Sequence, residues 1–502
     1  MKKMMIWMAC ILALCGCSRY ERVEVPTTPA PVVVRKSDEG TVEETAEEST
    51  EETVEEAVPE EPPKPQKTVV KVKGIYVSAY VAGTPDLMDA IIENIDKTEI
   101  NAVVIDVKDD NGRISFAMDS PMVTELGAVK KFIPDMESLM AKLKAHNIYA
   151  IARVVAFRDP YLAEERPDLS LKLADGSIYR DNKGLAWVNP YKKEAWDYLV
   201  EVGKEAHKAG FDEVQFDYIR FSTEKGIKDV VYDEADTKGR TKTEIITEFV
   251  RYAYEELSEE GVNVAADVFG AIIGGGQDSD TVGQSYADMA ESLDYICPMI
   301  YPSHYGDGNF GIEHPDTQPY DTILAALKKS KEDLRAHASE EKTQAIVRPW
   351  LQDFTASYLA NYIPYGDAEI RAQIQAVYDA GYDEWILWSA ANKYHWGGLK
   401  TPEEAEAEAK QIEESRAAEP ETTAPETTAS ESIAPETTAA ETVASESTAP
   451  GTTAPETTAA ETVVSESIAP GTIASETTTP GAAVSETDSA KTAKQPETAA
   501  AQ

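Results

Sequence analysis

One stretch of the sequence decides the fold: Gly210-Phe211-Asp212-Glu213-Val214-Gln215-Phe216-Asp217-Tyr218-Ile219-Arg220-Phe221. Glycine is favoured just after a helix, and the alternation of apolar and polar side chains that follows predicts a strand at Glu213–Phe221. The period of two places Gln215, Asp217 and Ile219 on one face, and Val214, Phe216 and Tyr218 on the other. A buried carboxylate is costly unless it is paired or takes part in chemistry, so Asp217 is the first candidate for a functional residue.

Short apolar runs of this kind alternate with longer amphipathic stretches on both sides of that strand. The predicted strands are Gly74–Val81, Ala102–Val107, Tyr149–Phe157, Glu213–Phe221, Asn263–Phe269, Tyr295–Tyr301, Gln344–Leu351 and Glu384–Ala390. The predicted helices are Pro85–Thr98, Asp135–His146, Tyr191–Ala209, Thr243–Glu259, Gln284–Ser292, Tyr320–Leu334 and Asp367–Ala380. Eight alternations over residues 73–400 predict an α/β fold, a single (β/α)₈ TIM barrel, with a charged helical extension at 401–416. A doubly wound open sheet is the alternative, but no glycine fingerprint follows the first strand.

The segments outside the predicted barrel differ from it in composition. Residues 18–72 are rich in Glu, Thr, Val and Pro, and residues 417–502 repeat Thr, Glu, Pro and Ala, with Glu436–Pro450 recurring almost unchanged at Glu456–Pro470. Neither segment can bury a core, so both are predicted to be disordered. The chain has 90 acidic and 47 basic residues and a net charge of −43. That charge argues against nucleic acid as a partner.

The first residues predict an export signal. Lys2 and Lys3 precede the apolar run Met4–Leu14, which ends in Leu14-Cys15-Gly16-Cys17. Residues 1–17 thus have the pattern of a signal peptide, and their end resembles the lipobox of bacterial lipoproteins, in which the last cysteine, here Cys17, receives the lipid. We therefore expect an extracytoplasmic protein that is lipid-anchored to the bacterial cell membrane. An ordinary signal peptide with an accidental cysteine is the alternative.

Charged residues of several predicted strands should meet at one rim, because functional side chains of a barrel lie at the C-terminal ends of its strands. Alternation places Asp267 on the inner face of its strand and Asp106 with Lys108 on another. Arg348, Trp350 and Gln352 share a third inner face, with Asp353 at the edge. Any single Asp could instead pair with Arg153, Arg220 or Arg348. Several converging carboxylates favour glycoside hydrolysis, which needs one acid to protonate the leaving oxygen and another to attack or to activate water.

Aromatic and amide side chains follow the same strand ends. Flat rings stack on the apolar faces of sugars, and amides bind their hydroxyl groups. Together with the charged rim they form the predicted substrate-binding set: Asp106, Lys108, Arg153, Trp187, Gln215, Arg220, Tyr301, His304, Tyr305, Trp350, Gln352, Trp388 and Asn392. Trp385 is expected to pack in the core.

These residues lie in motifs that resemble a known family, the glycoside hydrolase domains of bacterial lipoproteins and surface proteins called domain of unknown function 4015. The resemblance covers roughly Lys73–Leu399. Its matching stretches are Val104–Asp110, Ala152–Phe157, Gly210–Phe221, Asp267–Gly270, Pro298–Tyr305 and Pro349–Phe354.

The family's distant similarity to α-amylase-type enzymes implies roles for three acids. Asp217 would be the nucleophile, Asp267 the acid/base and Asp353 a stabilising acid. Amylase-like enzymes place Glu where this chain has Asp267, so the resemblance leaves open whether the reaction retains or inverts configuration.

Other functions are less consistent with the sequence. Its six histidines form no His-x-His or His-Glu-x-x-His motif, and no Gly-Lys-Ser/Thr follows Gly274-Gly275-Gly276, which argues against a metal hydrolase and a nucleotide-binding protein. Cys297 is the one cysteine beyond residue 17, so neither a disulfide framework nor a thiolate zinc site is expected. We expect no cofactor, a polysaccharide or oligosaccharide substrate, and a monomer. A non-catalytic glycan-binding surface lipoprotein remains the alternative.

Overall fold

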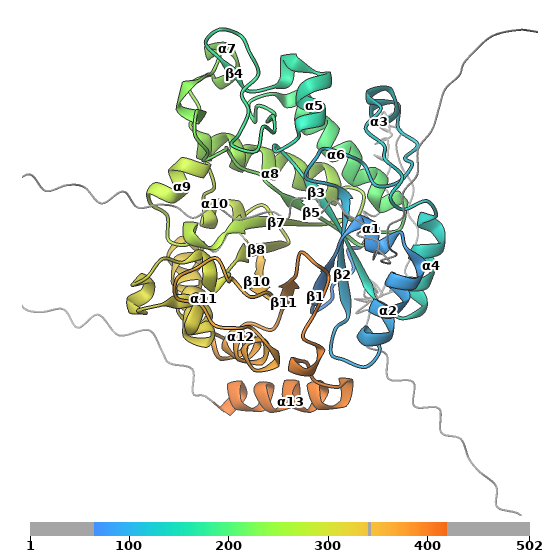
Figure 1. The fold of residues 1–502 in the computed structure, drawn as a ribbon, viewed down its shortest axis with the longest axis vertical. Coiled ribbons are helices and arrows are strands. Elements are labelled where there is room, and N and C mark those ends of the chain that lie inside the picture. Colours follow the sequence, from blue (N-terminus) through green and yellow to red (C-terminus); the bar gives the residue numbers. More distant parts are fainter. Residues whose placement is uncertain (1–64, 340–342, 419–502) are drawn as a thin grey trace, which may run out of the picture. The chain divides into compact units, whose positions relative to one another are not determined.

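Parallel strands close into a barrel at the centre of the computed structural model, which describes residues 65–339 and 343–418 (Figure 1). The strands are β1 (Lys73–Val77), β2 (Ala102–Lys108), β3 (Tyr149–Val155), β5 (Glu213–Asp217), β7 (Asn263–Phe269), β8 (Tyr295–Met299), β9 (Ile346–Val347), β10 (Trp350–Gln352) and β11 (Trp385–Trp388). β9 and β10 are two halves of the seventh strand, interrupted at Pro349, which lacks the N–H of a continuous ladder. β10 pairs with both β8 and β11 and so completes the ring.

Helices surround this barrel, as the sequence predicts. They are α2 (Pro85–Ile95), α4 (Met136–Ala145), α6 (Lys193–Lys208), α8 (Lys242–Ser258), α10 (Tyr286–Ala290), α11 (Pro319–His337), α12 (Asp367–Asp379) and α13 (Pro402–Ala418). Each of the seven predicted helices is present within a few residues of its expected bounds. The predicted fold class, a (β/α)₈ barrel, is confirmed. The signal peptide and the repeats of the C-terminal tail lie outside the described residues.

Additional short elements follow the C-terminal ends of the strands. They are α1 (Ala79–Ala82), α3 (Pro121–Leu126), α5 (Pro160–Glu165), α7 (Glu234–Thr237), α9 (Gln277–Val282) and a two-stranded sheet of β4 (Lys172–Leu173) and β6 (Val230–Val231). Figure 1 shows α5, α7 and β4 gathered on one side of the barrel mouth. The predicted strand Gly74–Val81 was wrong at its end, since β1 stops at Val77 and Ala79–Ala82 form α1. The other segments were expected to be loops, because they are too short for a helical or strand period to appear.

Two separate layers of apolar side chains explain why the strand pattern could be recognised. The outer layer, between strands and helices, contains Val103 and Ile105 of β2 together with Val214 of β5. The inner layer fills the barrel and contains Val104 of β2 and Ala265 of β7. Neighbouring residues on one strand therefore belong to different layers, because successive side chains of a strand point to opposite faces.

β5 ends four residues earlier than predicted, and the reason is the backbone of Tyr218. Its φ of 52° lies in the left-handed region, which a bulky residue seldom adopts. This turn reverses the alternation expected for the end of the strand. Ile219, expected inside the barrel, packs in the outer layer, and Tyr218 packs above the strand ends with Trp187.

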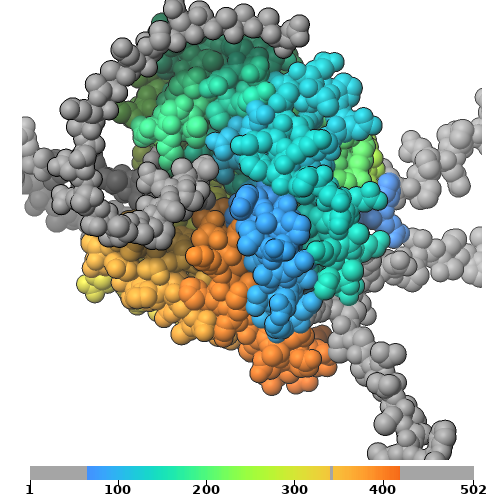
Figure 2. Space-filling model, turned by 45° about the vertical axis from the view of Figure 1, so that its right-hand side comes forward, coloured from blue at the N-terminus to red at the C-terminus, as the bar shows by residue number. Residues whose placement is uncertain are grey.

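Residues ahead of β1 are also part of the fold. Val70 and Val72 are buried in the inner layer, and the Lys67 Nζ lies 2.6 Å from Asp294 Oδ2. At the other end, α13 packs Ile412 against the outer layer, and Arg416 Nη1 lies 2.7 Å from Asp383 Oδ1. Figure 2 shows the C-terminal surface in orange beside the N-terminal surface in blue. In residues 65–339 and 343–418 no helix is long and apolar enough to cross a membrane.

A truncation series tests the role of residues 65–72. A chain of residues 65–418 should unfold cooperatively, whereas a chain of residues 73–418 should lose roughly 3–6 kcal/mol of stability, because two buried valines are removed at about 1.5–3 kcal/mol each. Urea denaturation followed by tryptophan fluorescence measures the difference. Equal free energies of unfolding for the two chains would show that burial of these valines does not stabilise the barrel.

Candidate active site

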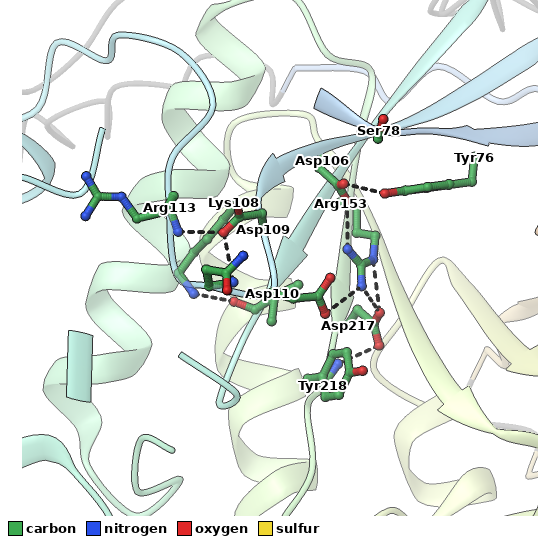
Figure 3. A network of polar contacts seen from close by, with 12 residues as sticks. Tyr76, Ser78, Asp106, Lys108, Asp109, Asp110, Arg113, Arg153, Asp217 and Tyr218 are labelled. Atoms are coloured by element: carbon green, nitrogen blue, oxygen red, sulfur yellow. Dashed lines mark hydrogen bonds and ion pairs between the residues drawn. The ribbon is translucent and has the colours of Figure 1, made fainter. Parts of the chain in front are cut away.

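A buried arginine on β3 organises the mouth of the barrel (Figure 3). The guanidinium of Arg153 donates to Asp217 Oδ2 from Nε at 3.0 Å and from Nη2 at 2.6 Å. Its Nη1 donates to Asp106 Oδ1 at 2.7 Å, and Nη2 lies 3.5 Å from Asp110 Oδ1. The arginine is 2% exposed, so these carboxylates compensate a charge that water cannot reach.

Asp106 is held from its other side by Tyr76 of β1. The hydroxyl of Tyr76 donates to Asp106 Oδ2 at 2.5 Å, and the Tyr76 ring packs on Trp388 with centroids 4.3 Å apart. Burial raises the pKa of Asp106 to about 6, although the charge of Arg153 opposes that shift. Tyr76 was not among the predicted site residues, because the one charged residue of β1, Lys73, does not share its face of the strand.

Asp217 and Asp267 are neighbours on adjacent strands. The pairing of β5 and β7 ends with Phe216 opposite Ala266, so the next residues along the two strands are these acids. Asp217 Oδ1 accepts from the N–H of Tyr218 at 2.6 Å, a contact made by the left-handed turn. One oxygen of Asp217 is thus bound by Arg153 and the other by a peptide N–H.

Asp267 has the opposite environment. Its Oδ1 accepts from the indole N–H of Trp350 at 2.6 Å, and no other hydrogen bond to its side chain occurs among the described residues. Burial raises the pKa of Asp267 well above its usual value, and the negative charge of Asp217 raises it further, while the Trp350 bond acts in the other direction. Burial and the charge of Asp217 thus both favour the protonated form of Asp267, and Oδ2 is the oxygen that the Trp350 hydrogen bond leaves open to a proton.

A second layer of contacts supports the turn at Tyr218. Arg158 Nη1 donates to the Tyr218 hydroxyl at 2.7 Å, and Asp110 Oδ1 lies 3.7 Å from the same nitrogen. Asp110 thus lies between Arg153 and Arg158. The sequence analysis did not select Asp110 or Arg158, although Asp110 ends one of the motifs quoted above. Its place beside two arginines depends on the loop after β2, whose path the sequence does not reveal.

Several predicted site residues lie close to this centre. Trp350 reaches Asp267, and the Trp388 ring lies 5.8 Å from the guanidinium carbon of Arg153. Tyr301 belongs to the inner layer, and its pKa is raised by burial and then by the charges of Asp267 and Asp217. Gln215 lies two residues before Asp217 on β5 and is fully buried. Among the described residues, neither of its side-chain amide atoms makes a well-oriented hydrogen bond.

Asp353 is bound by His395. It is 1% exposed, the Nδ1 of His395 lies 2.5 Å from its Oδ1, and the backbone N–H of His395 lies 3.1 Å from its Oδ2. Burial raises the pKa of Asp353, and the hydrogen bond from His395 opposes the shift. The predicted role of Asp353 as a stabilising acid stays a prediction.

Other predicted substrate-binding residues are engaged within the fold. Lys108 pairs with Asp159 at 2.8 Å because the β2–β3 register shifts between Asp106 and Lys108. Gln352 donates to Asp316 at 3.0 Å and accepts from the N–H of Ser303. Asn392 accepts from the Ser78 hydroxyl at 2.8 Å.

The predicted sugar-stacking rings are largely enclosed. Trp187 is 2% exposed and donates to Asp181 at 3.1 Å, and Tyr305 is 8% exposed. His304 packs on Tyr301 with centroids 5.1 Å apart, and burial lowers its pKa to about 4. Trp385 is core, as expected.

Arg220 is not the partner of Asp217 that its position in the sequence suggested. Its Nη1 donates to the carbonyl of Phe221 at 2.9 Å, and its guanidinium lies over the Trp187 ring. The ion pair of Asp217 is made with Arg153 instead, because Arg153 lies on the neighbouring strand and faces the same lumen.

No group of three or more His, Cys, Asp or Glu within residues 65–339 and 343–418 is arranged to hold a metal ion. At the barrel mouth, Asp106 and Asp217 are paired with Arg153, and Asp267 is buried against Trp350. Acid/base chemistry between two carboxyl groups is what this arrangement can perform.

Replacing Arg153 tests whether the ion pairs hold the site together. Arg153→Met should lower the free energy of unfolding by about 3–5 kcal/mol at pH 7, because it leaves buried carboxylates unpaired. The loss should shrink at pH 5, where these carboxyl groups can take up protons. Arg166→Met is the matched control, since Arg166 pairs with Asp168 at 2.6 Å but is about half exposed. That variant should change stability by at most about 1 kcal/mol. Equal losses in the two variants would contradict this account.

Comparison with solved structures finds similarities that include the following three chains, each with a TM-score below 0.5. A hypothetical protein from Ruminiclostridium thermocellum is 39% identical over 39% of this chain and 97% of its own, with a TM-score of 0.36. The PgaB (BpsB) glycoside hydrolase domain of Bordetella bronchiseptica is 13% identical over 69% of this chain and 98% of its own, with a TM-score of 0.43. Alpha-L-fucosidase isoenzyme 2 of Paenibacillus thiaminolyticus is 14% identical over 69% of this chain and 49% of its own, with a TM-score of 0.43. No curated protein matches the sequence.

The family model described as "Putative glycosyl hydrolase domain" matches residues 74–394. This range includes Asp217, Asp267 and Arg153. This range is more than half of the chain and agrees with the resemblance found in the sequence motifs. The chain belongs to this glycosyl hydrolase domain family.

Proposed function

We propose that the protein hydrolyses glycosidic bonds of an extracellular or cell-envelope polysaccharide with Asp217 and Asp267. The observation that carries the proposal is the contrast between these neighbouring acids. Asp217 is ion-paired with Arg153, whereas Asp267 is buried against Trp350 and has a raised pKa. One ionised and one protonated carboxyl group at the same site are what glycoside hydrolysis requires.

The reaction follows from these protonation states. Asp267 donates its proton to the glycosidic oxygen as that bond breaks, while Asp217 attacks the anomeric carbon and forms a glycosyl ester. Asp267, now ionised, then takes a proton from the water that hydrolyses the ester, which restores both acids.

The strand register supports retention of configuration. Adjacent strands are about 4.8 Å apart, near the roughly 5–5.5 Å between the acids of retaining enzymes and below the roughly 6.5–9.5 Å of inverting enzymes. Arg153 keeps Asp217 oriented through both hydrogen bonds to Oδ2. Oδ1, which accepts only the N–H of Tyr218 among the described residues, is the oxygen in position to attack.

Turnover by acid variants tests the proposal. Reducing-end release from a panel of cell-wall and capsular polysaccharides should fall by about two to four orders of magnitude in Asp217→Asn and in Asp267→Asn. The rate should also decline as pH rises through the pKa of Asp267, since only the protonated acid can donate; Asp217→Asn should shift that pKa downward, because it removes the nearby negative charge.

Asp168→Asn is the control for these variants. Asp168 is an exposed acid that pairs with Arg166, and both residues lie far from β5 and β7 in the sequence. A folded Asp217→Asn variant with wild-type turnover would rule out Asp217 as the nucleophile. A wild-type protein that binds glycans and never releases a reducing end would instead support the alternative, a glycan-binding surface lipoprotein.

We also propose that the protein is exported and anchored by a lipid on Cys17, with the barrel outside the cell membrane. The support is the sequence Leu14-Cys15-Gly16-Cys17 after the apolar run. Mass spectrometry of the N-terminal peptide from membrane extracts should show a chain that begins at Cys17 and carries acyl groups. A secreted protein with unmodified Cys17 would contradict the anchor and leave the proposed hydrolysis unaffected.

A further inference from the structure

The loop between β10 and α12 is one of the longer uncharged segments of the chain. Residues 354–366, here called the uncharged loop, contain no Asp, Glu, Lys or Arg. Charged residues make up 27% of the whole chain, so about three or four would be expected in a segment of this length. The loop is also directly connected to the site, because it follows Gln352 and Asp353 at the mouth of the barrel.

The uncharged loop presents two aromatic rings to solvent. Tyr358 is 53% exposed and Tyr362 is 41% exposed. Between and beside them, Ser357 and Asn361 are also exposed. Rings of this size are normally buried, so their exposure on a loop next to the candidate active site needs an explanation.

The base of the uncharged loop is fixed, which keeps the rings on its outer side. Tyr365 is buried, donates from its backbone N–H to the Thr355 hydroxyl oxygen at 3.0 Å, and donates from its own hydroxyl to the carbonyl of Asp316 at 3.1 Å. Phe354 packs edge-on against Tyr301 with centroids 6.0 Å apart. Ala356 is fully buried. Tyr358 and Tyr362 are therefore exposed on an anchored loop.

The other strongly exposed aromatic residues of the described chain lie on the same face of the barrel. Phe310 follows β8 and is 37% exposed, and Tyr80 follows β1 and is 64% exposed. The strand order runs β7, β8, β10, β11, β1, so these rings follow the rim from beside Asp267 to the opposite side of the mouth. Two exposed aliphatic residues, Val69 ahead of β1 and Ile346 as the first residue of β9, lie instead at the N-terminal ends of strands, at the other end of the barrel.

We propose that the uncharged loop is the binding platform for an uncharged polysaccharide chain, which Tyr358 and Tyr362 hold across the barrel mouth toward the acid pair. The inference rests on the proposed hydrolysis and specifies its substrate class. Tyrosine rings offer flat apolar faces for pyranose rings, and the hydroxyl group of Ser357 can bind sugar hydroxyls. Asn361 offers its amide oxygen, since its Nδ2 donates to Asp307 Oδ2 at 3.4 Å and lies 3.2 Å from His314 Nδ1.

Charge selects the kind of glycan. The chain has a net charge of −43, which repels a polyanion, and the loop has no Lys or Arg to compensate. It also has no carboxylate that would bind a polycation. Tyr, Ser and Asn occur in protein-binding surfaces as well, so a protein partner or a second copy of the chain is the outcome that an experiment must separate from a glycan.

Affinity electrophoresis of the full chain tests the platform. The probes are mixed-linkage β-glucan, glucomannan and glycol chitin as neutral polysaccharides, with polygalacturonate as the polyanion. We expect at least one neutral probe to retard the protein and polygalacturonate not to retard it. The double variant Tyr358→Ala, Tyr362→Ala should bind that neutral probe about ten- to a hundredfold more weakly, because two stacking contacts are lost.

The matched control is Leu87→Ala, Ile346→Ala, which removes side chains that are 42% and 45% exposed away from the uncharged loop. The control should bind like the wild type, and both double variants should keep the wild-type melting temperature, because all four side chains are exposed. Retardation by none of the neutral probes would overturn the proposal. An equal loss in the control would also overturn it, as would a Tyr variant that changes self-association in sedimentation velocity but binds glycan normally.

The readout is binding, so it is independent of turnover. Asp217→Asn should still be retarded by the neutral probe, even though its hydrolysis is expected to be lost. Hydrolysis that depends on Asp217, together with unchanged binding by the Tyr variant, would overturn the platform and leave the proposed hydrolysis standing. Binding that depends on Tyr358 and Tyr362 without any turnover would support the platform and overturn the proposed hydrolysis.

Discussion

The structure of the barrel mouth depends on one buried positive charge, the guanidinium of Arg153. An arginine that is 2% exposed is tolerated only where carboxylates surround it, and the two that bind it within 3 Å come from the strands on either side. A slip of β2 or β5 by one residue would turn Asp106 or Asp217 to the outer face and leave the charge unpaired. The ion pairs therefore fix the register of three adjacent strands, in addition to any role in chemistry.

A second buried arginine, Arg348, pairs with carboxylates of other strands at the opposite end of the lumen. Arg348 donates to Glu213 at 2.8 Å and to Glu384 at 2.9 Å, and its guanidinium lies 3.7 Å from the centre of the Tyr295 ring. The apolar inner layer, with Trp350 and Cys297, separates the two arginines. β5 carries a carboxylate for each of them, Glu213 at its start and Asp217 at its end, which explains why its inner face is so polar for a central strand.

The contrast between the two acids also follows from Arg153. Because the arginine pairs with Asp217 and does not hydrogen-bond Asp267, the two neighbouring carboxyl groups experience different fields. Burial raises the pKa of Asp267, and the charge of Asp217 raises it further. One cation placed off-centre thus gives two chemically equal side chains different electrostatic environments.

The sequence predicted the barrel well because strand periodicity is a local property. Outer-layer residues such as Val214 and inner-layer residues such as Gln215 alternate in the chain as they do in space. The inner positions of Asp106, Asp217 and Asp267 followed from the same rule. The left-handed conformation of Tyr218 could not be predicted in this way, because that residue type does not favour it.

The positions of the aromatic residues show more clearly what strand periodicity cannot predict. Rings in the motifs at the strand ends, such as Trp187 and Trp350, are buried because they close the top of the lumen against Asp181 and Asp267. Whether such a ring faces a sugar or a neighbouring side chain is decided by the loops that fold over it, and a strand pattern holds no information on those loops. Tyr358 and Tyr362 lie in a segment without periodicity, where absence of charge was the available signal.

The rim itself is braced by contacts between successive loops, and this bracing connects the exposed rings to the buried acids. His395, after β11, binds Asp353 at the end of β10, and Asn392 binds Ser78 at the end of β1. Strands β10, β11 and β1 are therefore tied together above the barrel as well as within the sheet. The uncharged loop leaves this braced edge directly after Asp353. Asp267 is bound by Trp350 of the same β10, and residues 353–357, which include the packed Phe354 and the buried Ala356, lie between this strand and Tyr358. In the proposed platform, a glycan held by the loop is therefore positioned relative to Asp267 through β10 and the anchored base of the loop.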